Sequence, residues 1–495
     1  MKTCLLVLTL GLVGTAILLG TGAAAAQDNP PAAEDIEPLA RGPVHEAYAE
    51  PVDYHPQPGP VVTKKPADPI DELPPDQKPD GHDVRWIPGY WAWDGESSDY
   101  LWVSGFWRDV PPAHHWVPGA WQEVEGGWQW SPGFWASDET QEVNYVPYPP
   151  PSADAGPSTP ADQPTDVYAP GCWVWRDARW FWRPGYWVAY KPDWVWAPAR
   201  YVWTPGGCVF TDGYWDHPLE RRGLLFCPVR ILRRDLAGWA YVPSLVVRTD
   251  FLLTALFVGP SRHHYYFGDY FGDGDKKRGF VAWIDYRPTK HSWDPIYDHY
   301  RVRYHAEPAW DRNLHDLYRA RFAGEIARPP HTLREQEKVI QNFAVNKNGS
   351  VNVIKNINFT RAENVAALTT LSNVHEQKMT RLAGLAPGLK VEAVPAMKLQ
   401  VVKKEDLARE KQQIQHVREV TQQRSAHEAK LVTAGTVHLK PAEHPKTTQL
   451  VVPKSPVVRP APTVKPPPRP VMPKHEERTV PVHEPPKPPK PPHKK

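Results

Sequence analysis

One hexapeptide, Trp-x-x-Gly-x-Trp, recurs along the first half of the chain and limits what the chain can fold into. Nineteen of the 23 tryptophans lie between Trp86 and Trp215. The first four copies begin 16, 14 and 14 residues apart, and a period this regular is typical of a repeat architecture. The copies are Trp86–Trp91, Trp102–Trp107, Trp116–Trp121, Trp130–Trp135 and, after a gap, Trp182–Trp187.

The hexapeptides predict short antiparallel hairpins. Their aromatic and β-branched residues favour strands, and Asp94-Gly95 and Glu125-Gly126-Gly127 favour turns. Tryptophans five residues apart would point to opposite faces of a regular strand. We therefore expect a kink or bulge at the central glycine, with positive φ, that returns both indoles to one face. The residues predicted to have this structural role are Trp86, Gly89, Trp91, Trp102, Gly105, Trp107, Trp116, Gly119, Trp121, Trp130, Gly133, Trp135, Trp182, Gly185 and Trp187.

Changes in composition divide the chain. Segments rich in proline and charge, and poor in large apolar side chains, cannot bury enough surface to offset chain entropy. The predicted order is a signal peptide (1–26), a disordered acidic Pro-rich linker (27–83), a first repeat module (84–145), a Pro-rich linker (146–170), a second Trp-rich β domain (171–328), a helical region with a short strand (329–435) and a disordered basic Pro/Lys-rich tail (436–495). The fold class is thus mainly β, with C-terminal helices and long disordered segments.

Helical spacing appears mainly beyond the β domain. We expect helices near 310–322, 333–343, 362–385 and 404–432, with a strand between 351 and 359. In the last helix the apolar seam fails at Thr421 and Arg424, so no coiled coil is predicted.

The N-terminus resembles a cleavable export signal. Lys2 precedes an apolar run from Leu5 to Leu19, and small residues follow at 24–26. No later run is apolar for long enough to cross a membrane. We therefore expect an exported protein, in the periplasm, the cell envelope or outside the cell, with no transmembrane span after cleavage.

Three cysteines would remain after cleavage. In an oxidising compartment Cys172 and Cys208 could form a disulfide, and the alternative is three buried free thiols, including Cys227. No Cys or His spacing resembles a zinc site, so no metal or cofactor is predicted.

Charge is distributed unevenly. Residues 27–160 hold 23 Asp and Glu against 6 Lys and Arg, a net charge of −17, whereas residues 440–495 hold 12 Lys and Arg against 4 Glu, a net charge of +8. A basic tail of this kind could bind an anionic polymer or the acidic front of its own chain, or both ends could simply be solvated.

The hexapeptides between Trp86 and Trp187 resemble the WXXGXW repeat family, also described as YXWGXW repeats, of bacterial exported and envelope proteins. The segment 201–226 is similar to the longer members, and the resemblance covers about half of the chain. Many members are short lipoproteins, whereas Cys4 lies ahead of the apolar run and not at its end. The resemblance implies export and a Trp-rich β structure, and it implies no activity.

The aromatic residues suggest two roles. Indoles could stack on sugar rings, or they could form the core of small hairpins. The residues before the second Trp of a hexapeptide, Tyr90, Phe106, Phe134 and Tyr186, are the predicted ligand-binding face. His114-His115 and His263-His264 are interpreted as ordinary surface residues. No motif of a serine hydrolase, zinc protease or phosphate-binding loop is present.

These observations predict a non-enzymatic structural or scaffolding protein of the bacterial envelope, with repeat modules and a basic Pro-rich tether. The alternative is a protein that binds glycan or cell wall through exposed aromatic residues. The expected partners are a wall or other envelope polymer or another envelope protein, and no specific nucleic acid. Self-association stays open.

Overall fold

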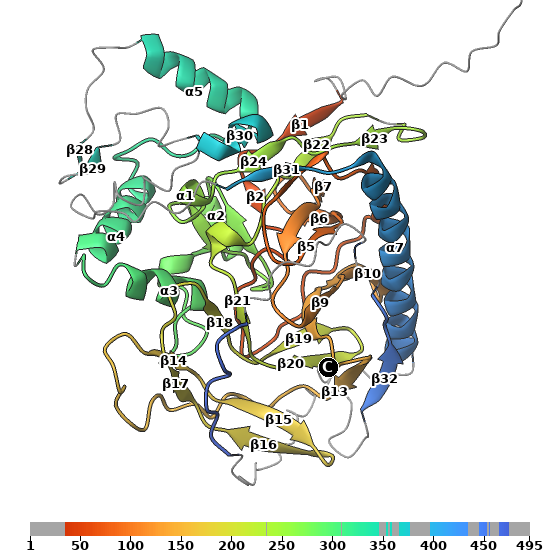
Figure 1. Cartoon of the computed structure of the whole chain (residues 1–495), viewed down its shortest axis with the longest axis vertical. Helices are drawn as coiled ribbons and strands as arrows, with labels where there is room; N and C mark the ends of the chain where they lie inside the picture. The colour runs from red at the N-terminus through yellow and green to blue at the C-terminus, as the bar shows by residue number, and fades with distance from the viewer. Residues whose placement is uncertain are drawn as a thin grey trace, which may run out of the picture.

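The computed structural model describes residues 35–233, 235–307, 309–345, 353–354, 357–358, 366–376, 397–433, 445–452, 455 and 465–474. The fold is mainly antiparallel β with a long C-terminal helix, as the sequence predicts (Figure 1). In the described part of the chain, no helix combines the length and apolar character needed to span a bilayer. The predicted signal peptide lies outside the described residues.

The hexapeptides act in pairs. Two of them form one long hairpin, termed here a repeat unit, and both strands of the hairpin are interrupted at the centre of the hexapeptide. Unit 1 contains β5 (Val84–Ile87), β6 (Tyr90–Asp94), β7 (Asp99–Val103) and β8 (Phe106–Asp109), and unit 2 contains β9 (His114–Val117), β10 (Ala120–Val124), β11 (Gly127–Ser131) and β12 (Phe134–Ser137). Unit 3 contains β14 (Val167–Ala169), β15 (Cys172–Arg176), β16 (Arg179–Arg183) and β17 (Tyr186–Val188), and unit 4 contains β18 (Val195–Ala197), β19 (Arg200–Thr204), β20 (Gly207–Thr211) and β21 (Tyr214–Asp216).

Each unit places two pairs of aromatic rings directly opposite each other across the strands. The ring centroids are 5.1 to 5.6 Å apart, and most pairs meet edge to face, the arrangement that the quadrupoles of aromatic rings favour. The pairs are Trp86 with Trp107, Trp91 with Trp102, Trp116 with Trp135, Trp121 with Trp130, Tyr168 with Trp187, Trp173 with Trp182, Trp196 with Trp215 and Tyr201 with Phe210. Units 3 and 4 thus also contain degenerate hexapeptides, at 168–173, 196–201 and 210–215, in which Tyr or Phe replaces a terminal tryptophan.

The central glycine serves close packing. The repeat glycines do not have positive φ, so that part of the prediction is wrong. A Cβ at Gly133 would lie 2.2 Å from Cζ2 of Trp116, and one at Gly119 would lie 2.3 Å from Cζ2 of Trp130. In unit 2, glycine is needed because an indole of the paired hexapeptide lies directly on the backbone. In unit 1 the opposing backbone and the Glu72 carboxylate occupy this space at Gly89 and Gly105.

The N-terminal Pro-rich segment is part of the fold. It forms β1 (Ile36–Pro38), β2 (Gly42–Pro43), β3 (Asp71–Glu72) and β4 (Gln77–Pro79). Val44, Tyr48 and Ile70 are buried in the main core. The prediction of disorder at 27–83 is therefore wrong for residues 35–83, because these few apolar side chains pack against the repeat units.

Short strands and helices follow unit 4. They are η1 (Leu219–Arg221), β22 (Val229–Ile231), β23 (Ala240–Tyr241), β24 (Leu245–Val247), α1 (Thr249–Leu252), β25 (Leu256–Val258), β26 (Tyr265–Phe267), α2 (Asp273–Arg278), β27 (Val281–Ala282), η2 (Trp283–Asp285), α3 (Pro295–Arg303) and α4 (Ala309–Phe322). Three four-stranded sheets join distant parts of the described chain, and two of them have the orders β1-β22-β7-β6 and β2-β26-β25-β27. One continuous core runs from Ala40 to Ile414 and includes tryptophans of units 1 and 2. The first repeat module and the later β segments therefore share a core.

The remaining elements are α5 (Leu333–Val345), β28 (Val353–Ile354), β29 (Ile357–Asn358), β30 (Leu368–Thr370), η4 (Leu371–Glu376), β31 (Leu399–Val401), α7 (Lys404–Thr433) and β32 (Lys446–Gln449). The predicted helices at 310–322, 333–343 and 404–432 are confirmed as α4, α5 and α7. The helix predicted at 362–385 is wrong for the described residues 366–376, where β30 pairs with β24 and η4 follows. Edge pairing to β24 overrides the helical spacing in this segment.

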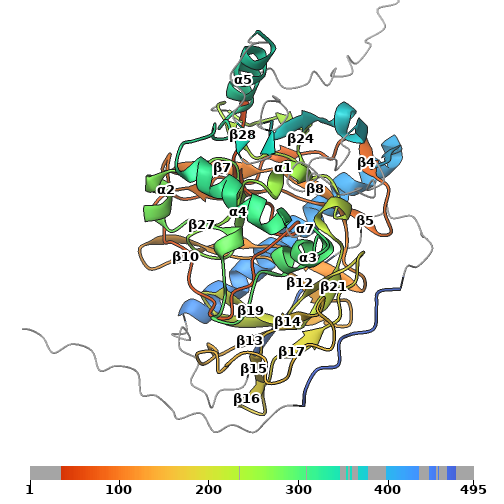
Figure 2. The same ribbon diagram turned by 90° about the vertical axis from the view of Figure 1, so that its left-hand side faces the viewer.

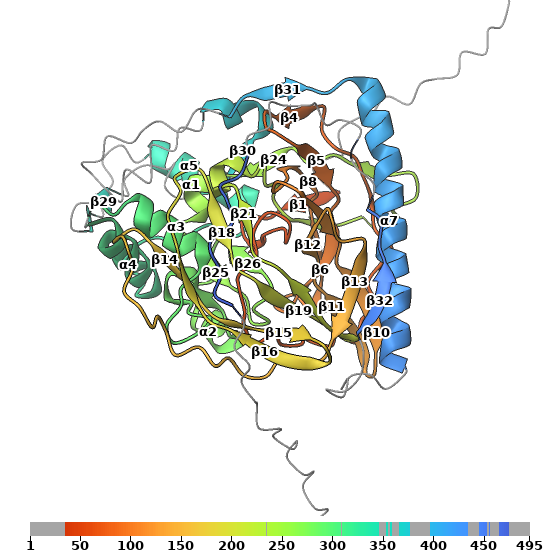
Figure 3. The ribbon, with the colours of Figure 1, turned by 60° about the horizontal axis from the view of Figure 1, so that its bottom comes forward.

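Helix α7 runs along one side of the molecule beside β10 (Figure 3). Where its apolar seam fails, Arg424 and Glu428 form a fully buried ion pair of 2.8 Å. Glu428 also accepts hydrogen bonds from Gln122, Ser131 and Tyr145. The polar interruption in the seam is thus the site where the helix is attached to unit 2 and to β13 (Glu142–Val146).

Described parts of the linker at 146–170 and of the basic tail also belong to the fold, contrary to the prediction of disorder. Strand β14 is part of unit 3, and β32 adds to the edge of β13. Residues 465–474 extend over unit 4 (Figure 2). These segments are held by hydrogen bonds to the repeat units and to β13, a source of order that composition does not reveal.

Candidate functional site

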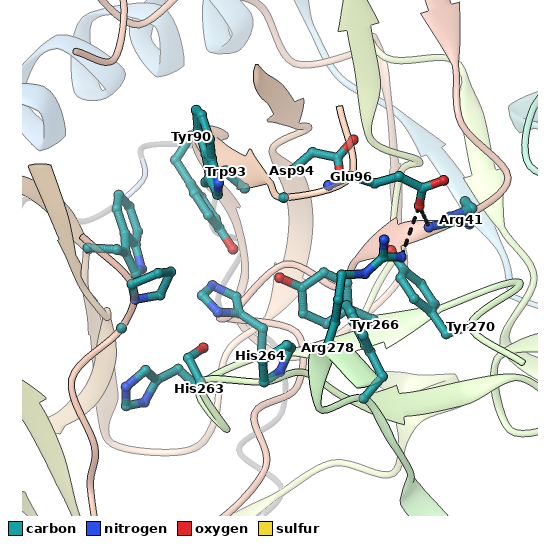
Figure 4. Close-up of a pocket in the computed structure, with 18 of the residues that line it drawn as sticks. Arg41, Tyr90, Trp93, Asp94, Glu96, His263, His264, Tyr266, Tyr270 and Arg278 are labelled. Carbon is teal, nitrogen blue, oxygen red and sulfur yellow. Dashed lines mark hydrogen bonds and ion pairs between the residues drawn. The ribbon is translucent and has the colours of Figure 1, made fainter. Parts of the chain in front are cut away.

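A pocket of about 310 Å³ lies between units 1 and 2 and the sheet that contains β26. This volume falls at the lower end of the range that small-ligand sites occupy. Figure 4 shows Tyr90 and Trp93 on one side, and His263, His264, Tyr266 and Arg278 on the other. Most of the lining comes from Arg41, Gly59, Pro60, Tyr90, Ala92, Trp93, Asp94, Gly95, Glu96, Trp121, Trp130, His263, His264, Tyr266, Tyr270, Arg278 and Phe280.

Stacked aromatic rings form the walls. Tyr90 stacks on Trp130 with centroids 4.9 Å apart, and Tyr270 stacks on Phe280 at 4.3 Å. Tyr266 meets Phe280 edge to face at 5.0 Å. Because each ring is supported by a second one, the walls are rigid and present flat apolar faces.

Charged groups gather at the turn between β6 and β7. Glu96 accepts from Arg41 at 2.5 Å and from Arg278 at 3.2 Å, and both contacts are drawn in Figure 4. The Arg41 guanidinium also lies 4.4 Å from the ring centroid of Tyr270. Burial opposes the charge of Arg41, but Tyr270 and Glu96 outweigh burial and raise the pKa of its guanidinium. The rim therefore offers hydrogen-bond donors and acceptors of both charges beside the apolar walls.

Two adjacent histidines line the opposite side. Burial, together with the neighbouring His264, lowers the pKa of His263 to about 4, so its imidazole is neutral at pH 7. His264 Nε2 lies 2.8 Å from the buried Glu46 carboxylate. Burial opposes ionisation of Glu46, but His264 and hydrogen bonds from Trp130 and Gly133 lower its pKa. The interpretation of His263-His264 as ordinary surface residues is therefore wrong.

The structure separates the four predicted ligand-binding residues. Tyr90 lines the pocket. Phe106, Phe134 and Tyr186 are 0%, 2% and 8% exposed, so the prediction that they form an exposed face is wrong for these three. Phe106, Phe134 and Tyr186 pack into hydrophobic clusters instead, and among the four residues Tyr90 alone faces the pocket.

The predicted disulfide is not formed. Cys172, Cys208 and Cys227 are free and buried, as in the alternative. Strand pairing sets Cys172 opposite Arg183 and Cys208 opposite Trp203 and Val146, in different sheets. Burial raises the pKa of all three thiols, to about 12 at Cys227, which makes them poor nucleophiles.

Most of the pocket was not predicted. Trp93, Tyr266, Tyr270 and Phe280 reach it from distant segments, and only the density of aromatic residues at 263–304 hinted at a site. Among the described residues, no three His, Cys, Asp or Glu side chains are grouped to hold a metal ion. The arrangement suits ring stacking and hydrogen bonding.

The fold and pocket define a repeat protein built from tryptophan hairpins. A family model described as the WXXGXW repeat (2 copies) matches residues 81–108, 98–122, 167–188 and 192–216, and the chain therefore carries WXXGXW repeats, as the sequence resemblance suggested. The two later matches include the degenerate hexapeptides of units 3 and 4. No curated protein and no solved structure matches the chain.

Proposed function

We propose that this is an exported, non-enzymatic protein of the bacterial envelope that binds a glycan in the pocket between units 1 and 2 and β26. The observation that carries the proposal is a cavity of about 310 Å³ with stacked aromatic walls and a charged rim. The C–H face of a sugar ring packs against aromatic faces, and its hydroxyl groups bond to carboxylates, guanidinium groups and imidazoles.

The repeat tryptophans have a scaffolding role in this proposal. Paired indoles such as Trp102 and Trp107, 1% and 0% exposed, are committed to the core and cannot reach a ligand. Ligand contact is left to the aromatic residues that line the pocket, which include Trp93 and Tyr266 and one paired set, Trp121 with Trp130. This proposal therefore favours the alternative drawn from the sequence, glycan binding, over the leading prediction of a structural envelope protein.

The experiment is calorimetric titration of the full chain with soluble oligosaccharides released from bacterial cell wall. The test variant is Trp93→Leu, which removes one wall of the pocket. Its matched control is Trp175→Leu, because Trp175 has the same position in unit 3. Both residues are half-buried and lie two residues after the last Trp of a hexapeptide. Trp93 pairs with Tyr100, and Trp175 pairs with Trp180.

We expect binding by the wild type, a loss of at least about 10-fold for Trp93→Leu and little change for Trp175→Leu, since a buried stacking contact contributes on the order of 1 kcal/mol or more. Equal losses in both variants would place the ligand elsewhere. A purely structural envelope protein would give a different pair of results. The wild type would bind no wall oligosaccharide, and both the wild type and Trp93→Leu would still sediment with intact cell wall.

A further inference from the structure

The repeat units bind extended Pro-rich segments of their own chain in one recurrent way. An indole N–H of a repeat unit donates to a backbone carbonyl of such a segment at 2.8 to 3.2 Å. The pairs are Trp91 with Asp68, Trp173 with Pro151, Trp187 with Thr159 and Trp215 with Pro468. Every acceptor is itself a proline or lies within two residues of one.

This contact has a physical basis. Proline has no N–H to offer a strand ladder, and an extended Pro-rich chain leaves its carbonyls unpaired and pointing outward. An indole on a flat aromatic surface supplies both a donor for the carbonyl and a face for the pyrrolidine ring. Aromatic grooves that recognise polyproline peptides use the same chemistry.

On unit 4 the covering segment adds side-chain contacts. Arg469 forms an ion pair of 2.9 Å with Asp212, and Met472 packs against the apolar cluster that contains Trp196 and Trp215. Val471, between them, is 92% exposed. The segment is thus held at Pro468, Arg469 and Met472, whereas Val471 faces solvent.

We infer that the face of unit 4 around Trp215 is a docking surface for a proline-rich, basic peptide, and that residues 465–474 are its resident ligand. This inference stands apart from the glycan pocket, which lies between other elements. The indole N–H fixes the peptide backbone, Asp212 selects a basic residue next to it, and the apolar cluster takes a long side chain three residues later.

A synthetic peptide of residues 465–474, carrying a fluorophore, tests the inference on the full chain by fluorescence anisotropy. In the wild type the resident segment competes with the added peptide. The variant Arg469→Glu/Met472→Asp should release the resident segment and raise the affinity for the added peptide at least about 10-fold. The matched control is Val471→Asp, which changes a residue exposed to solvent and should leave the affinity at the wild-type value.

A second variant identifies the surface. We add Asp212→Asn to the variant Arg469→Glu/Met472→Asp, termed here the released chain. Binding of the added peptide should weaken several-fold, because the Asp212 partner of Arg469 in the peptide loses its charge. Equal affinity of the wild type and the released chain, or undiminished binding after Asp212→Asn, would overturn the inference. Failure to bind glycan would not affect either result.

Discussion

Repeat units 1 and 4 have the same internal geometry and are anchored in different ways. Their ring pairs lie 5.2 to 5.5 Å apart in unit 1 and 5.1 Å apart in unit 4. The N-terminal Pro-rich segment covers unit 1 and inserts Glu72, which is 2% exposed. Glu72 accepts N–H bonds from Gly89, Gly105 and the Trp102 indole. The segment that covers unit 4 accepts one indole N–H and forms one ion pair whose side chains are 49% and 40% exposed.

The comparison separates two functions of the sequence. The paired hexapeptides set the shape of each hairpin, and the covering segment determines how firmly that hairpin is fixed. A buried acceptor shared by three donors is costly to remove, whereas an exposed ion pair contributes little. We therefore expect the effects of substitutions to differ between the two units.

The largest effect is expected for Glu72→Leu. The change leaves three buried N–H groups without their acceptor, at a cost of about 3 kcal/mol or more in the free energy of unfolding. Urea denaturation measures this loss, with Glu123→Leu at an exposed position of unit 2 as the control. A loss below about 1 kcal/mol would show that Glu72 does not anchor unit 1.

A glycine substitution should have the next largest effect. In unit 4 a Cβ at Gly213 would lie 2.4 Å from Cζ2 of Trp196, so Gly213→Ala should cost about 1–3 kcal/mol through overpacking. In the partner hexapeptide of unit 4, 196–201, the central residue is already Ala199. The opposite hexapeptide, 210–215, begins with Phe210 and not with tryptophan. Ala199→Gly is therefore the control and should cost no more than about 1 kcal/mol in the same assay.

The buried anchor of unit 1, Glu72, should make the free energy of unfolding depend on pH. Burial raises the pKa of Glu72 from 4.5 to about 7. Between these values the folded chain binds a proton that the unfolded chain has released, so this group makes stability fall as pH rises from 4.5 to 7. Glu72→Gln, which cannot titrate, should make the melting temperature fall less steeply over that window, and the other buried carboxyl groups supply the remaining slope. An unchanged slope would mean that Glu72 ionises normally.

The smallest effect is expected for Arg469→Ala in the segment that covers unit 4. Both partners of the ion pair are well solvated, so the loss should stay below about 1 kcal/mol and shrink further in high salt. A cost comparable to that of Glu72→Leu would remove the proposed difference between the two units. Denaturation at low and high salt provides the comparison.

Local patterns predicted the hairpins and the helices α4, α5 and α7, because hexapeptide spacing and helical spacing are local properties. The covering segments were misread as disordered, since Glu72 and Pro468 find their partners through contacts distant in sequence. The pocket could not be predicted for the same reason, because Tyr90 and Tyr266 line one cavity only when the β26 sheet packs against unit 1. The prediction of positive φ at the glycines is wrong because the close approach of a ring or of the opposing backbone, and not backbone chirality, requires glycine there.

The central claim is that the paired tryptophans outside the pocket are scaffold, and that the ligand contacts the aromatic residues between units 1 and 2 and β26. An indole N–H spectrum of ¹⁵N-tryptophan-labelled full chain, titrated with wall oligosaccharides, tests it most directly. We expect shifts confined to the tryptophans that line the pocket, Trp93, Trp121 and Trp130. Shifts of the paired tryptophans in units 3 and 4, with those three unchanged, would contradict it.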